Sequence, residues 1–392
     1  MTLFPFTRPK VGLYVTAGSL CVAHVSRRLG HQSFGGYVEQ PLPSRSIRLS
    51  PVEPNILERE QVINSLQAVF GHPKGPQSVA LCLPDLCART TIVEMATLPL
   101  QSKEQQALVE WRVQQDLRLS KQKFRISYQI FSSPSGGLSG SPPTGQPVRL
   151  LATAIQENII EAYEAMCLEV GLVPASIHLA SLAVFNMCRS LIDTTLNTSA
   201  ERISFVPGTQ FFLYLADWGY SIIIMRHQAP IFLRVKPLRH MSQLSATVSQ
   251  PIDPLDQQNQ GNTEVPGDGK QESAFAKEPD AGLNSFPPIA RTITNELVGT
   301  LQYYFETHET SIHTDEVYPL FLIGSHDPDN ALPLITELIQ QEFPFEVDHG
   351  TPRIKAFPIF PGNTNLNLKP LSGLPAWTST SLPAFAATSQ SA

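Results

Sequence analysis

Short apolar runs and amphipathic segments alternate along this chain in an order that occurs twice. In the first half, alternating or continuous apolar residues predict strands, and apolar residues at helical spacing predict helices. The strands are expected at 10–25 (two strands joined by a turn), 34–39, 78–83, 124–131, 148–155 and 175–179, and the helices at 59–70, 101–117, 158–170 and 182–192.

The second half begins the order again. Three strands are expected at 203–214, 220–225 and 231–235, followed by a helix at 289–306, a buried strand at 317–323, a helix at 332–341 and a last strand at 344–347. Three antiparallel strands followed by helix, strand and helix, occurring twice, predict a duplicated α/β unit.

Four segments interrupt this pattern. Residues 40–55 and 132–147 are rich in Pro, Ser and Gly and are expected to be connecting loops. Residues 241–287 are polar and acidic, and residues 351–392 form a tail rich in Pro, Ser, Thr and Ala. Segments with so few large apolar residues cannot offset the entropy lost on ordering, so both are predicted to be disordered.

Composition then limits the possible functions. The net charge of the 392 residues is −6, and no basic field covers the chain, so nucleic-acid binding is not expected. Its longest apolar stretch, 211–225, is shorter than the ~20 residues of a spanning helix, and the N-terminus does not resemble a signal peptide. We expect a cytoplasmic protein that does not insert into the membrane directly. The scattered cysteines are expected to be buried thiols: Cys21, Cys82, Cys87, Cys167 and Cys188.

Common catalytic motifs are missing from the sequence. It contains no GxxxxGK[ST], GxGxxG or HExxH motif. The sequence GLSGS at 137–141 lies in a Ser/Gly/Pro loop rather than between a strand and a helix, so it does not predict a nucleophile. Two hairpins, at 13–19 and 215–221, remain as candidates, because tight turns can direct several backbone N–H groups at one phosphate.

Around these hairpins the chain resembles the actin-like ATPase superfamily, and most closely its PilM branch. Residues KVGLYVTAGSLCVAHV (10–25) stand where the family has its opening phosphate hairpin, and LADWGYSIIIMRHQAPIFLRVKPL (215–238) is similar to the second. The most similar stretch is VRLLATAIQENIIEAYEAMCLEVGLVPASIHLASLAVFNM (148–187), and ITNELVGTLQYYF (293–305) is similar to a later helix. The resemblance covers 10–350 apart from the acidic insert.

The resemblance implies an α/β fold of two actin-like (RNase H-like) lobes, with a small inserted α+β subdomain in the first lobe. The expected boundaries are 1–85 plus 160–198 for the first lobe, 86–159 for the inserted subdomain and 199–350 for the second lobe, with a disordered insert at 241–287 and a disordered tail at 351–392.

A nucleotide site is also implied, but its residues have changed. The matching positions are Gly18, Ser19, Asp217, Gly219, Ser221, Gly324 and Ser325, and Asp217 would also bind a metal ion. However, the family's Asp is Tyr14, its first Gly is Thr16 and its Lys is Cys21. Losing two charge-assisted hydrogen bonds weakens binding about 10²–10⁴-fold. We therefore expect no cofactor, or ATP and Mg²⁺ held weakly without meaningful hydrolysis. Asp217 and Gly219 also suit a plain hairpin turn.

The implied function is that of a type IV pilus scaffold, peripheral to the inner membrane through its partners. It would bind the N-terminal cytoplasmic tail of a PilN-like bitopic membrane protein, in a groove between the first lobe and the inserted subdomain. Groove residues are expected within 88–131 and on the helix at 155–166, and a homo-oligomer is possible. Trp111 is either part of the core or an exposed anchor for the partner.

Three alternatives stay open. The first is a working ATPase of the same fold whose nucleotide state switches assembly. The second is the cytoplasmic part of a type II secretion component, which the polar C-terminal sequence disfavours. The third is a sugar-kinase-like enzyme, for which the sequence offers no recognisable catalytic Asp beside a substrate pocket.

Overall fold

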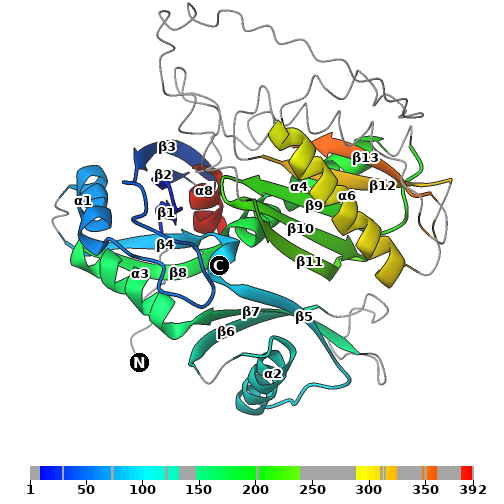
Figure 1. Ribbon diagram of the computed structural model, residues 1–392, viewed down its shortest axis with the longest axis horizontal. Coiled ribbons are helices and arrows are strands. Elements are labelled where there is room, and N and C mark those ends of the chain that lie inside the picture. Colours follow the sequence, from blue (N-terminus) through cyan, green and yellow to red (C-terminus); the bar gives the residue numbers. More distant parts are fainter. Residues whose placement is uncertain are drawn as a thin grey trace, which may run out of the picture.

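Two five-stranded sheets with the same topology organise the computed structural model (Figure 1). The described residues are 9–28, 31–71, 75–119, 122–131, 147–199, 203–238, 288–309, 312, 315–324, 347, 351–359 and 381–390. The first sheet has the order β3-β2-β1-β4-β8 and the second the order β11-β10-β9-β12-β13. In each sheet three antiparallel strands are followed by two that run parallel to the first of them. The predicted duplication is therefore confirmed.

The strand bounds are close to those expected from the sequence. The first sheet contains β1 (Val11–Val15), β2 (Ser19–Arg28), β3 (His31–Pro41), β4 (Gln77–Leu83) and β8 (Leu172–Leu179). The second contains β9 (Thr209–Ala216), β10 (Gly219–Arg226), β11 (Ala229–Pro237), β12 (Val317–Ile323) and β13 (Arg353–Pro358). Of the strand expected at 203–214, only the part from Thr209 joins the sheet as a regular strand.

Helices cover both sheets and form three apolar layers. Helices α1 (Arg59–Phe70) and α3 (Glu157–Glu169) pack on the outer face of the first sheet, and α6 (Pro288–His308) packs on the outer face of the second. The inner faces of both sheets share one core with α4 (Ala180–Ser199) and α8 (Ser381–Gln390). The two lobes therefore contact each other through buried side chains.

A small α+β unit is inserted in the first lobe. Strands β5 (Arg89–Met95), β6 (Phe124–Phe131) and β7 (Val148–Gln156) form an antiparallel sheet of order β5-β7-β6. Helix α2 (Ser102–Asp116) packs Val109 and Val113 onto one face of this sheet. Trp111 points away from that core and is 56% exposed, so the core interpretation of this residue is wrong.

The predicted disorder of 351–392 is wrong for two segments. Strand β13 extends the second sheet, and α8 packs on β1, β2 and β4 of the first lobe. Helix α8 was not predicted because it contacts the sheet through small side chains with little apolar surface, among them Ala384, Ala386 and Ala387. The insert at 241–287 and the helix expected at 332–341 lie outside the described residues, and of the strand expected at 344–347 only Val347 is described. The other domain boundaries stay predictions. All five cysteines are buried thiols, as expected.

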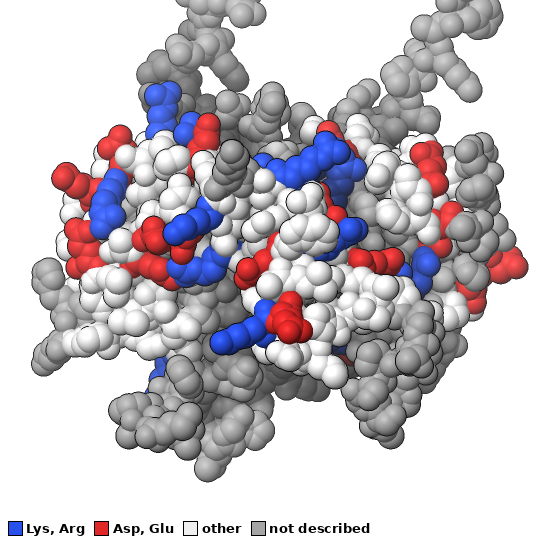
Figure 2. All heavy atoms as spheres, turned by 90° about the horizontal axis from the view of Figure 1, so that it is seen from below, with Lys and Arg blue, Asp and Glu red and all other residues white. Residues whose placement is uncertain are grey.

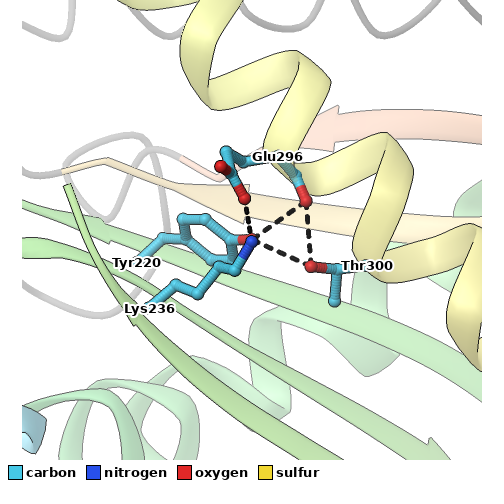
Figure 3. Close-up of polar contacts among 4 residues, drawn as sticks. All are labelled: Tyr220, Lys236, Glu296 and Thr300. Carbon is cyan, nitrogen blue, oxygen red and sulfur yellow. Dashed lines mark hydrogen bonds and ion pairs between the residues drawn. The ribbon is translucent and has the colours of Figure 1, made fainter.

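Polar contacts fix α6 to the second sheet (Figure 3). The Tyr220 hydroxyl donates to the Glu296 carbonyl oxygen at 3.1 Å and lies 2.9 Å from Thr300 Oγ1. Thr300 Oγ1 itself donates to the same carbonyl at 2.9 Å. The Lys236 ammonium group pairs with the Glu296 carboxylate. This cluster orients α6 over strands β10 and β11.

We expect Tyr220→Phe to lower the free energy of unfolding by about 1 kcal/mol, because Thr300 keeps its own bond to the carbonyl and only one hydrogen-bonded hydroxyl is lost. Urea denaturation measures the change. Tyr303→Phe is the control, since Tyr303 is half-exposed on the same helix, and it should change stability by less than ~0.5 kcal/mol. Equal effects of the two substitutions would contradict the role given to the cluster.

Candidate functional site

The first hairpin forms its hydrogen bonds internally. The buried Thr16 hydroxyl accepts hydrogen bonds from the backbone N–H groups of Gly18 (3.2 Å) and Ser19 (3.0 Å). The Thr16 N–H donates to the Ser19 carbonyl at 2.9 Å. An anion bound at this turn would need the same N–H groups. The Thr16 hydroxyl therefore accepts hydrogen bonds from the N–H groups that a phosphate would need.

The second hairpin joins β9 to β10 and needs its glycine for its own geometry. Gly219 has φ +149°, and a Cβ at this position would lie 2.1 Å from the Lys236 carbonyl oxygen. No other residue type fits there without moving β11. Its positive φ and the close approach of β11 thus both require glycine at position 219. Asp217, in the same turn, is half-buried.

Two aromatic side chains join the hairpins across the lobes. Trp218 Nε1 donates to the Tyr14 hydroxyl at 3.1 Å, and both side chains are buried in the shared core. Tyr14 comes from β1 of the first lobe, and Trp218 comes from the second-lobe hairpin. Burial, followed by electrostatic interactions with Tyr214 and Asp217, raises the pKa of Tyr14 well above its usual value, so its hydroxyl stays neutral. This pair is called the aromatic contact below.

A buried carboxyl forms the second connection between the lobes. Asp85 lies in a short 3₁₀ turn (Asp85–Cys87) that follows β4. Its Oδ2 accepts a hydrogen bond from Ser221 Oγ of β10 at 2.7 Å, and its Oδ1 accepts one from the Ser181 N–H of α4 at 3.3 Å. Burial raises the pKa of Asp85 to about 6, although hydrogen bonds from Ser221 and Ser181 oppose the shift.

Three of the predicted nucleotide-site residues, Gly18, Ser19 and Ser221, form hydrogen bonds within the protein. Gly18 and Ser19 lie in the first turn, and Asp217, Gly219 and Ser221 lie at the second hairpin, which the aromatic contact brings against β1. Gly324 follows β12 and is half-buried, and Ser325 lies outside the described residues. Within the described part of the chain, no group of three or more His, Cys, Asp or Glu side chains could hold a metal ion. The first turn as it stands does not fit a phosphate, since the N–H groups of Gly18 and Ser19 are bonded to Thr16.

Two residues of these contacts were not predicted from the sequence. Trp218 is recognisable there only as a neighbour of Asp217, and nothing local marks it as a partner of Tyr14. Asp85 follows the buried strand at 78–83 in the sequence Leu-Pro-Asp. A carboxylate directly after a buried strand could have indicated a functional residue. Its serine partners could not have been found, because they are 96 and 136 residues away in the sequence.

A groove of about 590 Å³ separates the inserted sheet from the first lobe. One wall is the face of that sheet opposite α2, with Leu151, Thr153 and Ile155 of β7 at alternate positions. The other wall contains six consecutive residues of β8, 174–179. The remaining lining residues are Arg125, Ser127, Tyr128 and Gln129 of β6, Ile160 and Glu164 of α3, and Leu182, Ala183 and Asn186 of α4.

Two strands that lie at sheet edges in the described part of the chain border this groove. Strand β6 is an edge strand of the inserted sheet, and β8 is an edge strand of the first five-stranded sheet. Consecutive lining residues on β8 mean that its backbone edge, rather than one face, borders the groove. The ranges expected for the groove, 88–131 and 155–166, contribute β6 and α3, whereas the contributions of β8 and α4 were not expected.

The groove carries few charges, and these are paired or neutral. Arg125 of β6 forms an ion pair with Glu164 of α3 at 2.7 Å. His178 Nε2 lies 2.9 Å from Ser176 Oγ, and burial lowers the pKa of His178, so its ring is neutral at pH 7. Figure 2 shows Lys and Arg interspersed with Asp and Glu on the face seen from below. The groove is therefore suited to an uncharged, extended ligand rather than to a polyanion.

The described helices include none that combines the length and the apolar character needed to cross a membrane.

This architecture, with two similar α/β lobes and a small inserted unit, defines the class of fold. No family model and no curated protein sequence matches the chain. Its structure is similar to that of the PilM-PilN type IV pilus biogenesis complex, with a TM-score of 0.60 and 15% identity over 98% of this chain and 97% of that chain. The predicted PilM-like, actin-like fold of two lobes is thereby confirmed.

Weaker structural similarities occur with two other proteins. One is a protein of unknown function with an actin-like ATPase fold from Bacteroides thetaiotaomicron (TM-score 0.40, 10% identity, 91% of this chain and 94% of that chain). Another is the cytoplasmic domain of EpsL, an inner membrane component of the type II secretion system of Vibrio cholerae (TM-score 0.34, 9% identity, 60% of this chain and 74% of that chain).

Proposed function

We propose that this chain is a non-catalytic, actin-like scaffold of a type IV pilus or related secretion assembly. Its groove between the inserted sheet and β8 would bind the N-terminal cytoplasmic tail of a PilN-like bitopic membrane protein. The single observation that carries the proposal is this groove, bordered by two edge strands and by a sheet face that no described helix covers. The similar fold in a complex with PilN is consistent with it.

The groove favours a peptide in extended conformation. A peptide strand beside β8 would form main-chain hydrogen bonds with an edge that has no partner strand in the described structure. Alternate side chains of such a strand would face Leu151 and Ile155 of β7, where apolar contacts provide affinity. Through this tail the protein would be held at the inner membrane.

The proposal includes independence from nucleotide. The Thr16 hydroxyl accepts hydrogen bonds from N–H groups of the first turn, and the Ser221 hydroxyl donates one to Asp85. We therefore expect ATP with Mg²⁺ to leave the thermal unfolding midpoint unchanged. A stabilisation that saturates at micromolar ATP would overturn the non-catalytic part of the proposal.

Binding of the partner tail is tested with a fluorescent synthetic peptide that copies the N-terminal cytoplasmic segment of a PilN-like membrane protein. Anisotropy should report saturable binding. Leu151→Asp should weaken it by about 30-fold, because a carboxylate on the groove wall must be desolvated at a cost of about 2 kcal/mol.

Trp111→Ala is the matched control for this experiment. Trp111 is exposed and belongs to α2, which covers the opposite face of the inserted sheet, so its removal should leave the affinity unchanged. Loss of binding in Trp111→Ala with normal binding in Leu151→Asp would place the partner on the wrong face for this proposal.

A further inference from the structure

The Asp85 carboxyl lies where the two lobes meet, and its hydrogen bonds come from both. Ser221 Oγ belongs to the second lobe and donates at 2.7 Å, while the Ser181 N–H belongs to the first turn of α4 and donates at 3.3 Å. The three residues are buried. Separation of the lobes would therefore break the bond to Ser221 and admit water to the carboxyl.

No cation compensates the charge of Asp85 among the described residues that shift its pKa. The ionisable neighbours on β4, the 3₁₀ turn and β9 are Cys82, Cys87 and Tyr214. Burial raises the pKa of each of them, so all three are neutral between pH 4 and pH 8.

Strand β11 also contacts the 3₁₀ turn and carries two cations, but they engage α6 instead. Arg234 lies over the Tyr303 ring at 5.8 Å from its centroid, and Lys236 pairs with Glu296. An ionised Asp85 is thus stabilised by hydrogen bonds from Ser221 and Ser181, and by no opposite charge on the described elements packed against it.

We propose that Asp85 is a proton-dependent latch between the two lobes, which hold together most tightly when this carboxyl is protonated. A neutral carboxyl keeps both contacts, since its second oxygen still accepts the Ser181 N–H and its own hydroxyl can donate to Ser221 Oγ. The latch goes beyond the proposed scaffold function and needs neither the partner peptide nor nucleotide.

The direction of the pH effect follows from the two states of the carboxyl. In the closed protein the pKa of Asp85 is about 6, and once water reaches the group its pKa returns toward the ordinary 3.8. A pKa raised in the closed form means that the extra stability is complete below pH 3.8 and is lost as the pH rises through 6. Between pH 5 and pH 7 the equilibrium constant for lobe separation should rise about tenfold.

Two buried cysteines of the first lobe can report lobe separation. Cys82 lies in the core shared by the lobes, whereas Cys167 lies in the outer layer under α1 and α3. Variants of the full chain that keep one or the other as the sole cysteine would be labelled with a dithiopyridine reagent from pH 5 to pH 7. The rates are divided by those of the denatured chain, which removes the pH dependence of the thiol itself.

Cys82 should react faster than Cys167, and its corrected rate should rise about tenfold from pH 5 to pH 7. Asp85→Asn, whose amide oxygen can accept the Ser181 N–H and whose NH2 group can donate to Ser221 Oγ, should abolish most of that rise. Ser221→Ala should keep the rise while increasing the rate at every pH.

Two results would overturn the latch. One is an equal labelling rate of Cys82 and Cys167 in the single-cysteine variants that keep Asp85. It would mean that the lobes separate only when the first lobe unfolds. The other is a tenfold rise that persists in Asp85→Asn. The first result needs no substitution at Asp85, so the test stands even if the Asn variant does not fold.

Discussion

Gly12→Ala is expected to displace α8 and to lower the free energy of unfolding by about 3 kcal/mol. A Cβ at Gly12 would lie 1.7 Å from the Ala384 carbonyl oxygen and 2.5 Å from its carbon. Both are backbone atoms, so no side-chain rotation relieves the contact, and the helix must move away from β1. The buried faces of Ala384, Ala386 and Ala387 would then lose their packing.

Urea denaturation measures this loss, and Gly18→Ala is its control. Gly18 is exposed, and no atom lies within 4 Å of the position that a Cβ would take there, so its substitution should change stability by less than ~0.5 kcal/mol. A chain truncated before Ser381 completes the experiment, because it lacks Ala384. In that chain Gly12→Ala should be nearly neutral, and an undiminished cost there would refute the proposed clash.

The elements of this fold that can be predicted from the sequence are those that the local pattern of apolar residues determines. The three-strand runs at the start of each half are largely apolar because one face of each sheet meets outer helices and the other meets the shared core. Tyr14 and Leu13, adjacent in β1, face different cores for this reason. Short apolar runs of this kind depend on nearby residues alone and are visible in a single sequence.

Helix α8 shows where such patterns fail. Its contact with β1 is a close approach of backbone to backbone at Gly12, and the helix uses alanines because larger side chains would hold it away. Alanine-rich segments bury little apolar area per residue, so the composition of this one predicts disorder. The helix is stabilised by its packing on β1, β2 and β4, and these contacts cannot be recognised from the tail sequence alone.

The candidate site was predicted in part for a similar reason. Resemblance pointed to both hairpins, and the changes at Tyr14 and Thr16 were visible as departures from the family pattern. What replaced the lost contacts was not visible, because Trp218 and Tyr14 are 204 residues apart and Ser221 and Asp85 are 136 apart. Such pairings depend on how the lobes dock, which no local pattern specifies.

Tyr14→Ala should destabilise the protein by about 3–5 kcal/mol, the second large effect we expect. The substitution removes a fully buried ring from the core shared by the lobes and also takes the acceptor from Trp218 Nε1. Tyr14→Phe keeps most of the ring and removes only the acceptor, so it should cost about 1–3 kcal/mol. The difference between the two variants measures the packing part of the aromatic contact.

Urea denaturation gives both values, and the emission of Trp218 reports the site itself. In Tyr14→Ala the emission should shift to longer wavelength as water reaches the indole, whereas Tyr303→Ala, on the half-exposed face of α6, should leave it unchanged. A loss below ~1 kcal/mol in Tyr14→Ala would mean that the ring adds little to lobe contact.

The same variant separates the two features that disfavour nucleotide. Tyr14→Ala creates space beside the hairpins but leaves the Thr16 hydroxyl bonded to the N–H groups of Gly18 and Ser19. We therefore expect ATP with Mg²⁺ to cause no thermal stabilisation of Tyr14→Ala. Adding Thr16→Gly frees those N–H groups, so thermal stabilisation by ATP with Mg²⁺ should first appear in the double variant. A response in Tyr14→Ala alone would show that the aromatic ring, rather than the internally bonded turn, is what excludes the phosphate.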